Sequence, residues 1–227
     1  MKGISNTKIK FFQQEILAWF ESNGRHRFPW RKEGLSPFQI VIAEVLLQRT
    51  KAETIEKFYE VFLMNFSSWE RIANAPIEEI EERLKPVGLY RQRAKRLKDL
   101  AVQMVQLQGE FPAEREELEK IPFLGQYIMN AIELQIFQKP SPLIDVNMSR
   151  VLERFFGERK MADIRYDPYL QELSNRVVNI PNSKEMSWAI LDFAALICKA
   201  RKPLCSICCV KNKCLYYARE EKKRKFA

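Results

Sequence analysis

Four cysteines near the C-terminus have the types and spacing that point most directly to chemistry. Six, two and five residues separate Cys198, Cys205, Cys208 and Cys214. Four thiolates in one short segment can ligate an iron-sulfur cluster, and four cysteines also suit a tetrahedral zinc site. A disulfide scheme would use them in pairs and leave Cys209 unmatched. The pattern favours a cluster, with zinc as the alternative.

Basic residues surround these cysteines and recur elsewhere in the chain. Lys and Arg outnumber Asp and Glu by 38 to 29, for a net charge of +9. The basic groups gather at 25–32, 91–98 and 199–225. Arg201 and Lys202 lie between two of the cysteines, where positive charge favours thiolates and attracts a polyanion. This asymmetry favours a nucleic-acid-binding face, although a charge run is also typical of solvated surface.

Length and composition limit the class of protein. A chain of 227 residues with 46% hydrophobic residues can form one large domain or two packed ones. No apolar run approaches the roughly 18 residues of a membrane span, and the N-terminus lacks a signal-peptide core. We therefore expect no membrane association and a cytoplasmic, nucleoid-associated location. We also expect a monomer, since no apolar stripe is long enough for a coiled coil.

Apolar residues recur at helical spacing nearly everywhere, and strand signals are absent. The first stripe, over 9–20, is followed by Asn23-Gly24, and Ser36-Pro37 reads as an N-cap and first helical residue. The pattern predicts an all-α fold. Beyond the two helices at these positions, it predicts helices over 53–66, 77–84, 90–108, 126–137, 146–156, 168–178 and 184–199.

Two polar residues interrupt the apolar helix that begins at Pro37. Glu44 and Gln48 are four residues apart and share one face. A carboxylate lining an apolar pocket has its ionised form disfavoured, which suits a general acid at neutral pH. A salt-bridged or exposed glutamate is the alternative interpretation.

A short turn joins two predicted helices near residue 123. It reads Ile121-Pro122-Phe123-Leu124-Gly125-Gln126-Tyr127, with Pro and Gly at the turn. The N–H groups of a turn that opens a helix form a nest for an anion such as a DNA phosphate. We expect Leu124, Gly125 and Gln126 to bind DNA there. Asp145 lies 18 residues beyond Tyr127 and, from the residues alone, reads as the N-cap of the next helix.

Taken together, these segments resemble the helix-hairpin-helix superfamily of base-excision DNA glycosylases. The resemblance is to the branch of endonuclease III and the adenine mismatch glycosylases, and above all to the thymine-DNA mismatch glycosylases. It spans nearly the whole chain. The residues that carry it are 28–31, 37–50, 87–90 with Arg93-Ala94, 121–127, 144–147 with Arg150-Val151, and the four cysteines.

The resemblance implies a two-lobed, all-helical fold with the DNA and base pocket in the groove between the lobes. A helical-bundle lobe at 24–136 would contain the hairpin. The other lobe, 1–23 with 137–227, would carry a C-terminal [4Fe-4S] cluster loop whose Arg201 and Lys202 lie against the DNA backbone. The partner would be double-stranded DNA with a mispaired or damaged base.

The resemblance also implies roles for individual residues. Asp145 matches the catalytic aspartate, which stabilises positive charge on the sugar and positions or deprotonates water. Glu44 matches a glutamate that reads or protonates the departing base. Gln48, with Arg49 beside it, matches the wedge that fills the gap left by base flipping.

Tyr127 stands where the bifunctional members carry a lysine. A phenol cannot form an imine with the opened sugar, so we expect hydrolysis by water, an abasic product and no efficient strand cleavage. As part of the site, Tyr127 would stack on the flipped base or sugar. It can also be read as a packed aromatic residue.

One position departs from the family pattern. The hairpin of the family usually has two glycines, and Phe123 replaces the first of them. A bulky residue resists a positive backbone angle, so we expect a distorted hairpin or a ring turned towards DNA.

The residues leave the substrate open. Thymine or uracil opposite guanine is favoured by Tyr127 and by the 13 residues that follow Cys214. Adenine opposite 8-oxoguanine or guanine is the second interpretation, although enzymes of that kind normally carry a further C-terminal domain. Damaged pyrimidines, a modified base in foreign DNA and a DNA-binding module without catalysis are the remaining ones.

Overall fold

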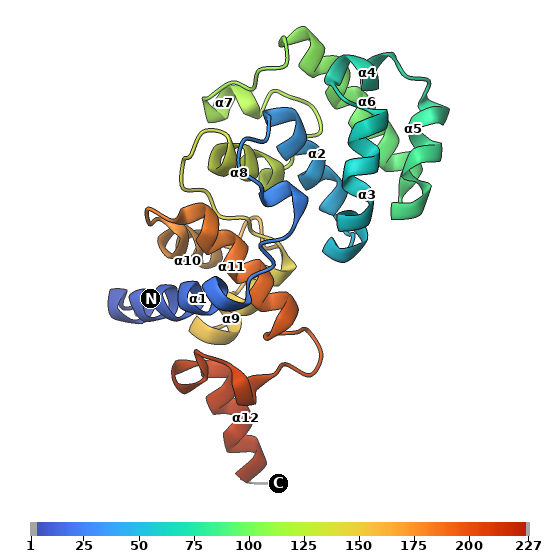
Figure 1. The fold of residues 1–227 in the computed structure, drawn as a ribbon. Coiled ribbons are helices and arrows are strands. Elements are labelled where there is room, and N and C mark those ends of the chain that lie inside the picture. Colours follow the sequence, from blue (N-terminus) through green and yellow to red (C-terminus); the bar gives the residue numbers. More distant parts are fainter. Residues whose placement is uncertain (1–3, 226–227) are drawn as a thin grey trace. The chain divides into compact units, whose positions relative to one another are not determined.

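The computed structural model describes residues 4–225, and in that range the chain is helical without a strand (Figure 1). The all-α prediction is confirmed. None of the helices in this range is long and apolar enough to cross a membrane. The α-helices are α1 Asn6–Asn23, α2 Pro37–Leu47, α3 Ala52–Asn65, α4 Trp69–Asn74, α5 Ile77–Leu84, α6 Tyr90–Gln106, α7 Arg115–Leu118, α8 Gln126–Gln135, α9 Val146–Phe156, α10 Pro168–Val178, α11 Ser183–Leu196 and α12 Leu215–Lys225.

The chain forms two compact units. One unit is continuous, His26–Phe137, and holds α2 to α8. The other runs up to Arg25 and resumes at Gln138, so it combines α1 with α9 to α12. Short 3-10 turns at Pro29–Arg31, Lys85–Val87, Cys205–Ile207 and Lys211–Lys213 complete the two units.

Helix α2 lies at the centre of the first unit. The Ser36 hydroxyl accepts a hydrogen bond from the Gln39 N–H, and Gln39 Oε1 accepts one from the Ser36 N–H, which makes a capping box with Pro37 at the first helical position. The helix is apolar on most sides and packs against α3 and α8, while α4 and α5 pack on α6. A helix that is apolar nearly all round belongs in a core, which is why Glu44 stands out on it.

The second unit is built on α1, α9 and α11, which pack against one another. Aromatic rings fill the contact: Phe12 lies 4.9 Å from Phe155 and 5.2 Å from Phe156 between ring centroids. Buried Asp192 on α11 pairs with Arg25 at 2.7 Å. The ring contacts hold the C-terminal end of α9 against α1, and Asp145 caps the other end of α9.

Several helices end earlier than the apolar pattern predicts. Helix α6 stops at Gln106 instead of 108, because Gln108 and Gly109 take left-handed backbone angles of +55° and +80°. Helix α8 stops at Gln135, not 137, and α11 covers Ser183–Leu196, not 184–199. Helices α4, α7 and α12 were not predicted.

Candidate active site

Glu44 is a buried carboxylate on α2. Its side chain is 4% exposed, so the interpretation as an exposed surface glutamate is wrong. Its Oε1 accepts a hydrogen bond from Nε2 of Gln135 on α8 at 2.7 Å. Gln135 was not among the predicted site residues, because nothing local in the sequence links it to Glu44.

The residues that follow α2 form an exposed turn. Gln48 and Arg49 are both exposed, and Arg49 has a left-handed φ of +58°. The Gln48 carbonyl accepts a hydrogen bond from buried Arg93 at 2.7 Å. Leu89, also exposed with a φ of +51°, was not predicted as part of this surface.

The hairpin before α8 keeps its positive backbone angle in spite of its phenylalanine. Phe123 has a φ of +69° and its side chain is 48% exposed. The expected resistance to this angle is therefore overcome, and the ring lies at the surface. The Leu124 side chain is buried at 8% exposure, and the DNA contact predicted for this turn, which uses backbone N–H groups, stays a prediction.

The backbone conformation at Gly125 does not require a glycine. Its φ is −77°, which any residue adopts, and an added Cβ would meet no atom within 4 Å. The Gly125 carbonyl accepts a backbone hydrogen bond from the Met129 N–H, so α8 begins at this turn. We call the turn formed by Gly125 and Gln126 the cradle. Because Gly125 has no side chain, an anion can approach the backbone of the cradle closely.

Tyr127 lies in the first turn of α8. Its ring is half-buried and packs against the hydrophobic core of its unit. The same unit holds Glu44 and Gln48, and α8 packs on α2. Part of the Tyr127 ring is therefore covered by core packing, and the rest is exposed to solvent.

Asp145 caps α9, as one interpretation of the sequence predicted. Its Oδ1 accepts hydrogen bonds from the Asn147 and Met148 N–H groups, each at 2.8 Å, and its Oδ2 accepts one from Asn147 Nδ2 at 2.6 Å. Burial raises the pKa of this carboxyl, although these bonds and the nearby charge of Arg150 act in the opposite direction. A half-buried carboxyl with a raised pKa is typical of functional sites, so the catalytic role predicted for Asp145 is compatible with its role as a cap.

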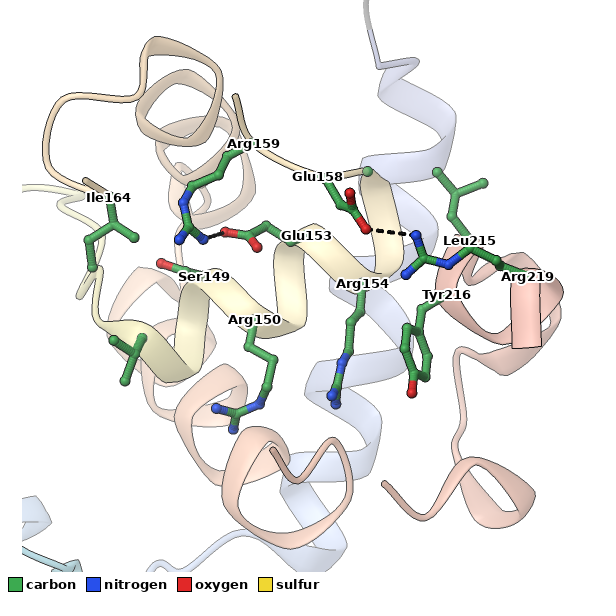
Figure 2. A pocket seen from close by; sticks show the side chains of 12 residues that line it. Ser149, Arg150, Glu153, Arg154, Glu158, Arg159, Ile164, Leu215, Tyr216 and Arg219 are labelled. Carbon is green, nitrogen blue, oxygen red and sulfur yellow. Dashed lines mark hydrogen bonds and ion pairs between the residues drawn. The ribbon is translucent and has the colours of Figure 1, made fainter. Parts of the chain in front are cut away.

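A chain of hydrogen bonds leads from Asp145 to the cysteine loop. Asn147 Oδ1 accepts from Arg150 Nη1 at 3.1 Å, and Arg150 Nε donates to the Cys198 carbonyl at 2.9 Å. Arg154, one turn further, donates to the Lys199 carbonyl at 2.7 Å and to Cys198 Sγ at 3.5 Å. Figure 2 shows both guanidinium groups turned to the same side of α9.

The four predicted ligands share one pocket. Cys198, Cys205, Cys208 and Cys214 line it together with apolar side chains, and Cys209 is not part of the lining. Cys209 Sγ instead donates to the Glu15 carbonyl at 3.7 Å. Among residues 4–225, no three His, Cys, Asp or Glu side chains converge on one point that could hold a single metal ion. Four thiols on one pocket are a donor set that an iron-sulfur cluster or a tetrahedral zinc ion would use.

Burial, and not the basic loop, dominates the chemistry of these thiols. Burial, with a smaller contribution from the neighbouring thiols Cys209, Cys214 and Cys198, raises the pKa of Cys208 to about 12. Arg201 and Lys202 are exposed. That the basic residues of the loop stabilise the thiolates stays a prediction, and a cation bound among the thiols would act in the same direction.

An open cavity of about 530 Å³ runs along the outer side of α9 (Figure 2). Its wall towards the cysteines consists of Arg154 and Tyr216, which line both this cavity and the cysteine pocket. The guanidinium carbon of Arg154 lies 4.6 Å from the centroid of the Tyr216 ring. Arg154 and Tyr216 therefore lie between the cysteine pocket and this cavity.

The chain matches known proteins over nearly its whole length. It is 33% identical to a thymine/uracil-DNA glycosylase from Pyrobaculum aerophilum, covering 97% of this chain and 96% of that protein. It is also 33% identical to a thymine-DNA glycosylase from Aeropyrum pernix, covering 96% and 99%. The structure of a thermostable thymine-DNA glycosylase matches with a TM-score of 0.86 and 33% identity, covering 94% of this chain and 98% of that one.

A family model assigns the class. The HhH-GPD superfamily of base excision DNA repair proteins matches residues 42–179, a range that contains Glu44, the hairpin and Asp145. This chain belongs to the HhH-GPD superfamily of base excision DNA repair proteins.

Proposed function

We propose that this protein is a monofunctional DNA glycosylase that removes thymine or uracil opposite guanine and leaves an abasic site. The observation that carries the proposal is the similarity, over nearly the full length of both chains, to a thymine/uracil-DNA glycosylase and a thymine-DNA glycosylase. Glu44, Tyr127 and Asp145 provide a carboxylate, an aromatic ring and a second carboxylate for that chemistry.

Asp145 is proposed to stabilise the sugar as its bond to the base breaks. The electron pair of that bond leaves with the base, and water adds to C1′ while giving up a proton. A carboxylate stabilises the positive charge on the sugar and accepts or directs that proton. Its three hydrogen bonds hold both oxygens in place, so little reorganisation accompanies the reaction.

Glu44 and Tyr127 are proposed to act on the base. Buried Glu44, oriented by Gln135, hydrogen-bonds or protonates the departing base. The half-buried ring of Tyr127 offers a stacking face. A phenol cannot form an imine with the opened sugar, so water remains the nucleophile.

The cysteine pocket is proposed to hold a [4Fe-4S] cluster through Cys198, Cys205, Cys208 and Cys214. Such a group would hold the 198–214 loop in shape. Exposed Arg201 and Lys202 on that loop are then available to DNA phosphates. Gln48, Arg49 and the hairpin at Gly125 and Gln126 are proposed as further contacts to double-stranded DNA, with the protein acting as a monomer.

Excision assays test this function. Labelled duplexes with G:T, G:U or adenine opposite 8-oxoguanine are incubated with the protein and analysed with and without alkali. We expect cleavage of the thymine or uracil strand only after alkali. Cleavage of the adenine strand would replace the proposed substrate, and cleavage without alkali would contradict the monofunctional assignment.

A further inference from the structure

Arg93 is a buried arginine whose guanidinium group joins two surface turns of one unit. It lies in the first turn of α6 and is 5% exposed. Its Nη1 donates to the carbonyls of Val87 at 3.0 Å and Gly88 at 2.9 Å. Its Nη2 donates to the Gln48 carbonyl at 2.7 Å and to Thr50 Oγ1 at 2.9 Å. We call residues 48–50 and 87–89 the paired turns.

The paired turns hold unfavourable backbone angles at exposed positions. Arg49, Gly88 and Leu89 have φ values of +58°, +71° and +51°. Residues with a side chain seldom adopt this region unless the surrounding structure imposes it. Gln48 and Arg49 are exposed, and Leu89 is 50% exposed. Strain is therefore maintained at a place where side chains point outward.

The four acceptors of Arg93 are three carbonyls and one hydroxyl, all of them neutral. A buried positive charge with neutral partners is unfavourable compared with an apolar side chain of similar size, and burial lowers the pKa of Arg93 accordingly. What the guanidinium supplies is geometry, because its planar fork binds several acceptors in fixed directions. Thr50 Oγ1 also lies 3.4 Å from the Val87 carbonyl, which ties the two turns directly.

We propose that Arg93 is a positioning residue for base extrusion. It holds the paired turns in one fixed relation, so that Gln48 and its neighbours meet the duplex already arranged to occupy the space of the extruded base. This inference rests on the proposed glycosylase function. Loss of the fork leaves the chemical groups Glu44 and Asp145 in place and raises the cost of opening the duplex.

The test compares two substrates that differ only in the free energy needed to open the base pair. Uracil opposite guanine is placed in a regular duplex and, separately, in a bubble of unpaired bases, and single-turnover excision is measured at saturating protein. For Arg93→Met we expect duplex excision to slow about tenfold or more, and bubble excision to stay within about threefold of native. Arg93→Lys keeps the charge but not the planar fork, so its rate of duplex excision should lie between those of the native protein and Arg93→Met.

A fluorescent readout reports extrusion without chemistry. With 2-aminopurine beside the mismatch, we expect Arg93→Met to lose most of the fluorescence rise that the native protein gives. Arg83→Met is the matched control, because it removes an exposed guanidinium from α5 of the same unit, outside the basic groups assigned to DNA binding. Its duplex-to-bubble ratio and fluorescence should equal the native values.

Two results would overturn the proposal. One is equal slowing of Arg93→Met and Arg93→Lys on both substrates, which would assign Arg93 to general stability. The other is native behaviour on both. Native protein that excises no uracil or thymine would instead overturn the proposed substrate, and the 2-aminopurine signal would still test the paired turns. Thermal unfolding establishes that each variant is folded, and Arg93→Lys serves if Arg93→Met is not.

Discussion

Gln135 on α8 donates a hydrogen bond from its Nε2 to Oε1 of Glu44 on α2 at 2.7 Å. A donor to a carboxylate favours its ionised form and fixes one of its two oxygens. The hydrogen bond uses Oε1 and so orients the plane of the carboxylate. Gln135 is therefore a positioning residue for Glu44.

Replacement of Gln135 by leucine removes this donor without adding charge. We expect Gln135→Leu to lower the single-turnover excision rate about tenfold. The pH–rate profile should also differ from that of the native protein, because one oxygen of the carboxylate has lost a hydrogen bond. Gln106→Leu, at an exposed position on α6, is the control and should leave the profile unchanged. An unchanged profile in Gln135→Leu would remove Gln135 from the site.

Asp145 links activity to a dependence of stability on pH. Burial raises its pKa in the folded protein, so the folded state binds this proton more tightly than the unfolded chain does. Its contribution to the free energy of unfolding is therefore present below the ordinary aspartate pKa and lost as the pH rises through the raised value. Asp145→Asn removes this dependence and should abolish excision while preserving DNA binding.

Urea unfolding of the native protein and Asp145→Asn at several pH values measures the effect. We expect the stability of the variant relative to native to increase from acid to neutral pH. A constant difference would contradict the raised pKa. Full excision activity in Asp145→Asn would show that another residue stabilises the sugar.

Tyr127 offers a gain-of-function test of the hydrolytic mechanism. A lysine at this position supplies an amine that can attack C1′, release the base and form an imine. We expect Tyr127→Lys to give a covalent protein–DNA product with borohydride and strand cleavage without alkali. Tyr127→Met, which lacks an amine, should give neither. Efficient trapping of the native protein would contradict the assignment of water as nucleophile.

The sequence predicts best what is local. Ser36 and Asp145 mark the starts of α2 and α9, because a cap bonds to N–H groups two or three residues away. The bonds that orient the site are not local: Gln135 and Glu44 are 91 residues apart, and Arg93 and Gln48 are 45 apart. Each of these residues is an ordinary helix former, and only the packing of α8 on α2 and of α6 near the 48–50 turn gives it a role.

The cysteine pocket predicts a defined iron content and a residue, Arg154, whose replacement exposes the cluster to air. We expect protein prepared without oxygen to contain iron and sulfide in equal amounts, and about four of each. Arg154 and Tyr216 separate the pocket from the open cavity on α9, so Arg154→Met should lose the cluster absorbance several-fold faster in air. Arg165→Met removes an exposed arginine of the same unit and should match the native rate. Zinc without sulfide would establish the alternative metal.

At Gly125 in the hairpin, a substitution is expected to change stability and DNA affinity in opposite directions. At Gly125 the φ of −77° and the open space around a Cβ allow alanine. Gly125→Ala should therefore stabilise the fold by about 0.4–1 kcal/mol. Phe123→Gly relieves the φ of +69° but adds freedom to the unfolded chain, so its net stabilisation should be smaller than about 1 kcal/mol.

Binding to duplex DNA over a series of salt concentrations separates the two positions. Gly125→Ala places a methyl group over the N–H groups of α8, so affinity should fall several-fold. The salt dependence should also weaken by about one phosphate contact. Phe123→Gly removes an exposed ring and keeps the cradle, so its salt dependence should equal that of the native protein. If Gly125→Ala binds as tightly as native, no phosphate approaches this turn and the hairpin is a structural element alone.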